Sequence, residues 1–101
     1  MGIEVTDNAD EHRFEIRTDG ELAGYAEYQL VKGERILFTH TEVDPAFGGQ
    51  GLGGKLVAGA LGAAVERGLA IIPLCPFVAR HVEQHRELLP HLDERIRKAF
   101  Q

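Results

Sequence analysis

Five glycines occur in the seven residues 48–54, directly after a strand-like run and directly before a helix-like one. Glycine in a helical segment costs roughly 0.5–1 kcal/mol relative to alanine, because it loses more backbone freedom on folding. A turn this rich in glycine therefore needs a reason, and the usual one is close approach of the backbone to a partner. The stretch predicts a strand–turn–helix connection whose main chain contacts a ligand. The alternative is a flexible turn with small residues for close packing of the helix on the sheet, extended by Gly59 and Gly62.

The residues before this turn predict an antiparallel meander. Residues 13–18 alternate in polarity and are followed by Asp19-Gly20, a dipeptide typical of two-residue hairpins, so we expect the first element to be a strand at 13–18. Residues 22–30 and 35–43 predict two further strands, separated by the turn at 32–34. Pro45 is expected to end the last of them.

The residues after the turn predict a helix and a parallel strand. From Leu52 to Val65 apolar residues recur at helical spacing, and Arg67-Gly68 supplies the cation and glycine that favour a helix end. The apolar run 69–74 has the length of a strand and is expected to return parallel to the strand before the helix. The glycine turn thus lies within a β-α-β unit.

Two short helices are expected at the C-terminus. They cover residues 77–89 and 91–100, and in the second one Leu92, Ile96 and Phe100 form an apolar stripe at i, i+4 and i+8. We find no repeat or linker, and 101 residues with 44% hydrophobic content suit one domain over residues 1–101.

Composition restricts the compartment and the partners. The longest apolar run is far shorter than the ~20 residues of a membrane span, and the acidic N-terminus differs from a signal peptide, so we expect a soluble cytoplasmic protein without a membrane partner. The single cysteine, Cys75, cannot form an internal disulfide. A net charge of -5 gives no electrostatic footprint for nucleic acid and favours a cationic acceptor.

Two nucleotide-binding motifs match the glycine stretch in part. The pattern G-x-G-x-x-G is present, but the following strand ends without an acid for a ribose, and the chain is too short for a doubly wound sheet. The pattern G-x-x-x-x-G-K is also present, but Leu56 replaces the Mg²⁺-binding hydroxyl. Both motifs depend on open amides at a helix N-terminus, which bind phosphate, so a pyrophosphate-bearing ligand is expected.

A third match covers the whole segment VDPAFGGQGLGGKL, residues 43–56. It resembles the acetyl-CoA loop of the GCN5-related N-acetyltransferases, in which a strand ending Val-x-Pro precedes Arg/Gln-x-x-Gly-x-Gly/Ala at a helix start. Gly51 and Gly53 match the two family glycines. Gly48 replaces the leading Arg or Gln, which leaves phosphate binding to the backbone amides, helped by Lys55.

The resemblance extends over most of the chain, with FTHTEVDP and PLCPFV typical of a small branch that lacks the usual N-terminal helices. It implies a single α+β domain whose mixed sheet splays between the strands ending at Val43 and Leu74, with the pantetheine of acetyl-CoA in the gap and no metal. The acceptor side would be open, and the acceptor an amine of unknown identity. The implied coenzyme contacts are Val43, Gly48, Gly49, Gln50, Gly51, Leu52, Gly53, Lys55 and Pro76.

Three side chains are candidates for acetyl-transfer chemistry, which needs a deprotonated amine, an oxyanion donor and a proton for the leaving thiolate. His40 and Glu42 alternate onto one strand face, about 7 Å apart by strand rise, and either could accept a proton through water. They could instead be a sheet-bonded histidine and a solvated carboxylate. Cys75 could accept the acetyl group, protonate the coenzyme or simply pack. A backbone amide near Val43 would hold the oxyanion.

One further pair has the spacing of zinc ligands. His81 and His85 share a helix face at i, i+4, but the sequence specifies no third ligand. We therefore expect no metal site, and interpret the pair as a solvated face or an edge contact to the coenzyme phosphates.

Three functions remain open at this level. The first is an acetyl-CoA-dependent N-acetyltransferase acting by direct attack of an amine or through Cys75. The second is a non-catalytic acyl-CoA-binding or protein-interaction module, and the third a purely structural domain. We expect a monomer or a weak homodimer.

Overall fold

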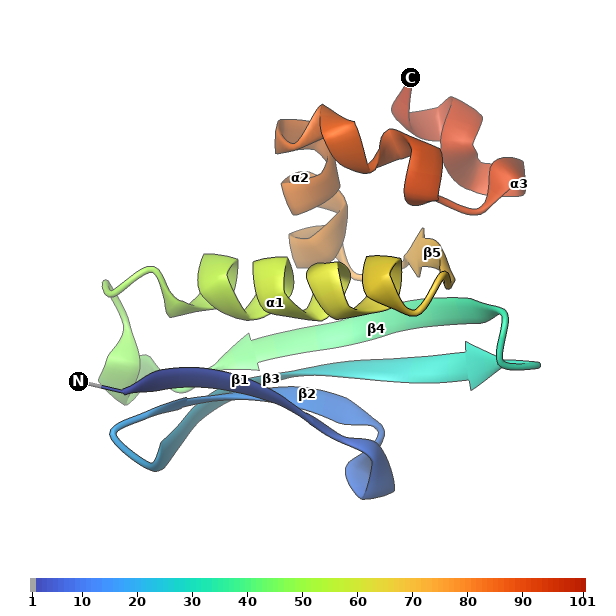
Figure 1. Ribbon diagram of the computed structural model, residues 1–101. Coiled ribbons are helices and arrows are strands. Elements are labelled where there is room, and N and C mark those ends of the chain that lie inside the picture. Colours follow the sequence, from blue (N-terminus) through green and yellow to red (C-terminus); the bar gives the residue numbers. More distant parts are fainter. Residues whose placement is uncertain (1) are drawn as a thin grey trace.

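The computed structural model describes residues 2–101 and contains a five-stranded sheet with a long helix across one face (Figure 1). Strands β1 to β4 are antiparallel neighbours in chain order, and β5 pairs in parallel with β4, so the predicted mixed α+β sheet is confirmed. The strands are β1 Ile3–Asn8, β2 Arg13–Thr18, β3 Glu21–Val31, β4 Arg35–Val43 and β5 Ala70–Pro73.

The helices follow the second half of the chain. The α-helices are α1 Leu52–Glu66, α2 Pro76–Gln84 and α3 Glu94–Arg97. Short 3-10 turns are η1 Ala9–Glu11, η2 Pro45–Phe47, η3 Arg86–His91 and η4 Lys98–Phe100. None of the helices formed by residues 2–101 is long and apolar enough to cross a membrane.

Helix α1 forms where the apolar spacing predicts it. Its end is fixed by Gly68, which has a left-handed φ of 71°. The amide of Gly68 donates to Val65 O at 3.0 Å, and the amide of Leu69 donates to Ala64 O at 3.0 Å, the pair of bonds that closes a helix on a glycine. This closure turns the chain directly into β5.

The core lies between α1 and the sheet. Figure 1 shows α1 and α2 on the same side of the sheet and no α-helix of residues 2–101 under the opposite face. The largest fully buried side chains come from both layers: Ile16, Ile36, Phe38, Leu52, Leu56, Val57, Leu61, Ile71, Val78, Val82 and Leu92. The opposite face of β2, β3 and β4 therefore remains uncovered by residues 2–101.

The sequence does not predict β1, and the expectation that the first strand is at residues 13–18 is wrong. Strand β1 is an edge strand in which Ile3 and Val5 alternate with Glu4 and Thr6, but this alternation covers only four residues of a polar, acidic N-terminal segment. Long-range contacts hold it: Val5 packs against Gly59 of α1, and Asp7 accepts hydrogen bonds from Tyr28 Oη at 2.6 Å and Arg67 Nη2 at 2.8 Å.

The C-terminal helices are shorter than predicted. Helix α2 ends at Gln84, and Pro90 falls in the 3-10 turn that follows. Leu92 is not helical but extended, and it forms a parallel bridge with Ile71 at the outer edge of β5. The predicted helical stripe is therefore wrong as a helix face, although Leu92, Ile96 and Phe100 all pack against the core.

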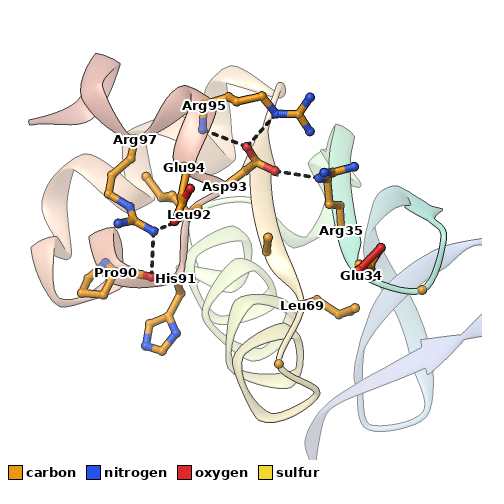
Figure 2. Close-up of a pocket in the computed structure, with 13 residues that line it drawn as sticks. Glu34, Arg35, Leu69, Pro90, His91, Leu92, Asp93, Glu94, Arg95 and Arg97 are labelled. Atoms are coloured by element: carbon orange, nitrogen blue, oxygen red, sulfur yellow. Dashed lines mark hydrogen bonds and ion pairs between the residues drawn. The ribbon is translucent and has the colours of Figure 1, made fainter.

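An ion pair secures this C-terminal segment at the end of the sheet remote from the glycine turn. Asp93 is buried, and its Oδ2 lies 2.8 Å from Nε of Arg35 at the start of β4 (Figure 2). The same carboxylate accepts the amide of Arg95 at 2.9 Å and so caps α3. A hollow of about 750 Å³ lies here, between the strand starts and residues 90–97.

Candidate active site

The sheet opens where β4 extends beyond the end of β5. The two strands pair only over Arg35–Phe38 and Ala70–Pro73. The amides of Leu74 and Cys75 then both donate to Phe38 O, at 3.0 and 2.9 Å, and the chain turns into α2. Residues 39–43 of β4 consequently have no β5 partner, and the splay implied by the resemblance is present.

A β-bulge at Thr39 sets which side chains face this opening. Tyr28 pairs with Phe38 and its neighbour Glu27 pairs with His40, so Thr39 is the extra residue on β4. Beyond the bulge Thr41 lies on the covered face with Phe38, while His40 and Glu42 turn to the uncovered face. Simple alternation from Phe38 would have placed them the other way round.

A cavity of about 540 Å³ occupies the space between β4, the start of α1 and α2. Helix α2 supplies one wall with side chains at i, i+3, i+4 and i+7, and β4 supplies the other. The lining residues are His40, Thr41, Gly54, Cys75, Pro76, Phe77, Arg80, His81 and Gln84.

Cys75 lies in this cavity as the N-cap residue of α2 and is 5% exposed. Its Sγ is 3.5 Å from Thr41 Oγ1. Burial by itself raises the pKa of the thiol, but hydrogen bonds from the Thr41 hydroxyl and the amides of Val78 and Phe77 outweigh burial, so the pKa is below its ordinary value. A helix N-terminus stabilises a thiolate in this way. The surroundings of Cys75 are therefore more polar than a packing role needs.

The glycine loop leads into α1 with its amides open. Gly49 and Gly51 have left-handed φ values of 80° and 70°, and Gly51 is the N-cap with no side-chain cap bond. Lys55 is the first residue whose amide bonds back, to Gly51 O at 3.3 Å. The preceding amides of α1 have no acceptor within the helix, as expected for a first turn. An anion could bind there.

Gly53 has a second, structural explanation. A Cβ on Gly53 would lie 2.5 Å from Cζ of Phe77, so this glycine allows α1 and α2 to approach closely. A Cβ on Gly49, Gly51 or Gly54 would meet no atom of residues 2–101 within 4 Å. The loop is thus open on its outer side.

His40 and Glu42 form a pair on the uncovered face. His40 Nε2 lies 3.1 Å from Glu42 Oε1, and the two side chains are 51% and 60% exposed. His40 is thus bonded to a side chain rather than within the sheet, and Glu42 is not merely solvated. His40 reaches the cavity rim, whereas Glu42 is not among the lining residues.

The other predicted contacts are divided between loop, core and rim. Gly48, Gly49, Gln50 and Lys55 are exposed, Leu52 is buried in the core, and Val43 is half-buried at the end of β4. Pro76 lines the cavity. Sequence reasoning missed Thr41, because the bulge that turns it inward has no sequence signal, and also missed Phe77 and Arg80.

His81 also lines the cavity, which the interpretation as a solvated face missed. Its ring stacks on that of His85, with centroids 4.0 Å apart and planes at 15°. Burial, and then the charge of His85, lower the pKa of His81. Within residues 2–101 no three His, Cys, Asp or Glu side chains converge in a group that could hold a metal ion.

The splayed β4–β5 pair, the glycine-opened helix and the cavity between them define the fold of an N-acetyltransferase of the GCN5 type. The family model described as GCN5-related N-acetyl-transferase matches residues 13–91. The chain belongs to this family.

A solved structure agrees with this assignment. It is the solution structure of a protein from Staphylococcus aureus that is described as GCN5-like, with 29% sequence identity and a TM-score of 0.62. The similarity covers 83% of this chain and 81% of that one. No curated protein matches the sequence.

Proposed function

We propose that the protein is an acetyl-CoA-dependent N-acetyltransferase that acetylates an amine. The observation that carries the proposal is the single cavity between β4 and α2, which begins at the open start of α1 and contains the Cys75 thiol where the sheet parts. Family membership supports acetyl transfer as the reaction class.

The residues fit acetyl-CoA by their chemistry. The open amides of residues 50–54, at the positive end of a 15-residue helix, suit the pyrophosphate, and Lys55 adds a cation nearby. The part of β4 beyond Phe38 has lost its β5 partner, so its main-chain groups that point away from β3 are free for the amides of pantetheine. An amide near Val43 would hold the oxyanion.

In the reaction, the nitrogen of a neutral amine attacks the thioester carbonyl, and the carbon–sulfur bond breaks as the coenzyme leaves as a thiolate. The nitrogen is positively charged after the attack and loses one proton to give the amide, and the thiolate gains one proton. Cys75 is placed either to donate that proton or to accept the acetyl group first as an intermediate thioester. The two routes differ in whether acetyl-Cys75 forms.

Calorimetry with acetyl-CoA and adenosine as separate titrants tests binding, and mass spectrometry with a panel of amines tests transfer. The panel comprises a polyamine, a lysine-containing peptide with a blocked N-terminus and a peptide with a free N-terminus. Thermal unfolding with each ligand provides a second measure of binding. A ligand present at 100 times its dissociation constant adds about 2.7 kcal/mol to the free energy of unfolding, which raises the melting temperature of a domain of this size by roughly 10–20 °C.

The outcomes separate the remaining functions. Acetylated product together with tighter binding of acetyl-CoA than of adenosine is the expected result. Binding without product for any amine would support the alternative of a non-catalytic acyl-CoA-binding module. If acetyl-CoA stabilises the protein no more than equimolar adenosine does, the coenzyme proposal is wrong.

A further inference from the structure

We propose that His81 is the general base that takes a proton from the acceptor ammonium. The proposal rests on the acetyl transfer proposed above, and it assigns the base to α2 rather than to β4.

The position of His81 follows from how α2 is anchored. Val78 and Val82, on one side of the helix, are 1% and 0% exposed and hold it against the core. The side that carries Phe77, Arg80 and His81 therefore faces the cavity. His81 follows Cys75 by six positions, which places its backbone about 9 Å along the helix from that of Cys75. That separation leaves room for a thioester carbonyl and an amine between them.

The chemical state of His81 suits a base. It is half-buried, and its ring is stacked at 4.0 Å on His85, whose Nδ1 contacts the main-chain oxygen of His81 at 2.8 Å. That contact uses the main-chain oxygen of His81 and not its ring. Burial, and then His85, lower the pKa of His81, which favours the neutral imidazole, the form that can accept a proton.

The charged groups around His81 have opposing effects. Glu87, in the turn after α2, raises the pKa of His81, whereas burial and His85 lower it, and the lowering dominates. Within the cavity the other ionisable side chains are Arg80 on α2, Cys75 at its start and His40 on β4. None of these is a carboxylate that could hold a proton on His81.

His40 is the competing base, and its geometry suits the role less well. Its side chain is 51% exposed, lies beyond the bulge on the uncovered face, and its Nε2 is already engaged by Glu42 at 3.1 Å. A base at the cavity rim on the uncovered face would need a water to reach an amine between Cys75 and His81.

The step balances as follows. The acceptor ammonium transfers one proton to a ring nitrogen of His81, and the resulting amine forms the carbon–nitrogen bond. As the carbon–sulfur bond breaks, the nitrogen loses its second proton and the coenzyme thiolate gains one. The protonated His81 then returns its proton to solvent.

The test compares His81→Gln with wild type, using Glu83→Gln on the exposed side of α2 as the matched control. We expect His81→Gln to lower kcat/KM by about 10²–10⁴-fold with unchanged acetyl-CoA affinity, and to remove the acidic limb of the pH profile. His85→Gln should instead move that limb to higher pH, because the ring that lowers the pKa of His81 is gone. Glu83→Gln should match wild type.

Three results would overturn the inference. If wild type is active and His81→Gln keeps its rate and pH profile, the base is elsewhere, and a loss confined to His40→Gln would place it on β4. An NMR titration in which the His81 ring of the free protein titrates no lower than an ordinary histidine would contradict the neutral state. If wild type acetylates no amine, acetyl transfer itself is wrong and the role of His81 falls with it.

Discussion

The sulfur of Cys75 lies 3.5 Å from the hydroxyl oxygen of Thr41, although 34 positions separate the two residues. Two features of the fold produce this contact. The bulge at Thr39 turns Thr41 to the covered face of β4, and the end of β5 at Pro73 carries Cys75 across the opening to start α2. The contact therefore joins the two sides of the splayed sheet within the cavity.

The first prediction concerns the acidity of this thiol. Thr41→Val should raise the pKa of Cys75, because it removes a hydrogen bond that favours the thiolate. Ultraviolet absorbance of the thiolate against pH measures the change directly, since the chain has a single cysteine. Thr39→Val, the same substitution at the bulge, is the control and should leave the titration unchanged. Equal titration curves for all three proteins would show that Thr41 does not act on the thiol.

The second prediction separates the two chemical routes. We expect direct attack, because an amine beside the thioester needs no intermediate. Incubation with acetyl-CoA and no acceptor should then leave no acetyl mass on Cys75, and Cys75→Ala should keep most of its rate. A kinetically competent, hydroxylamine-labile acetyl-Cys75 in a quench experiment, with loss of turnover in Cys75→Ala, would establish the covalent route instead.

The third prediction concerns the glycine loop. Gly51→Val should weaken acetyl-CoA binding at least tenfold, because a β-branched residue resists a φ of 70° and its side chain would cover the open amides. Lys55→Ala should change affinity only a few-fold, since a flexible exposed cation contributes little compared with fixed amides. Calorimetry on the folded variants measures both. Wild-type affinity in Gly51→Val would remove the phosphate-binding role of the loop.

The fourth prediction tests the packing of β1 through two glycines of the same helix. Gly62→Ala should stabilise the protein by about 0.5–1 kcal/mol, because a Cβ there meets no atom within 4 Å and alanine favours the helix. Gly59→Ala should lose that gain or destabilise, since its Cβ would lie 3.0 Å from Val5 Cγ1 and push β1 outward. Urea unfolding compares them, and equal stabilisation by both would mean that β1 does not pack against α1.

The fifth prediction concerns acid stability through Glu15, which is 3% exposed on β2. Its Oε1 lies 2.7 Å from Arg17 and its Oε2 2.7 Å from Arg13. The bond from Arg17 is the largest influence, and it outweighs burial and lowers the pKa of Glu15 to about 2. Because the folded-state pKa is below the unfolded one, this contribution is present above about pH 4.5 and is lost as the pH falls towards 2.

Glu15→Gln should therefore be less stable than wild type near neutral pH, by on the order of 1–3 kcal/mol after allowance for the partly solvated arginines. The difference should shrink as the pH falls through the range in which wild-type Glu15 becomes protonated. Denaturant unfolding at several pH values measures it, with exposed Glu4→Gln as the control. A difference that does not depend on pH would contradict the ion-pair explanation.

Local signals in the sequence determined much of the fold. The two-residue turn at Asp19-Gly20, the alternation in β2 and the spacing in α1 are properties of neighbouring residues, and each element was found where it was predicted. The glycine stretch likewise identified the loop before α1, because Gly49 and Gly51 have positive φ values, which would strain a residue that has a Cβ atom.

Only the tertiary structure decided the remaining features, since each depends on groups far apart in the chain. Strand β1 is held by the hydrogen bonds that Asp7 accepts from Tyr28 and Arg67. Leu92 is extended rather than helical because it forms a β-bridge with Ile71 at the edge of β5. The bulge at Thr39 reverses the faces of the residues after it, which turns His40 outward and brings Thr41 to Cys75. The sequence by itself determined which side chains were available for chemistry, and the pairing of distant strands determined which of them share the cavity.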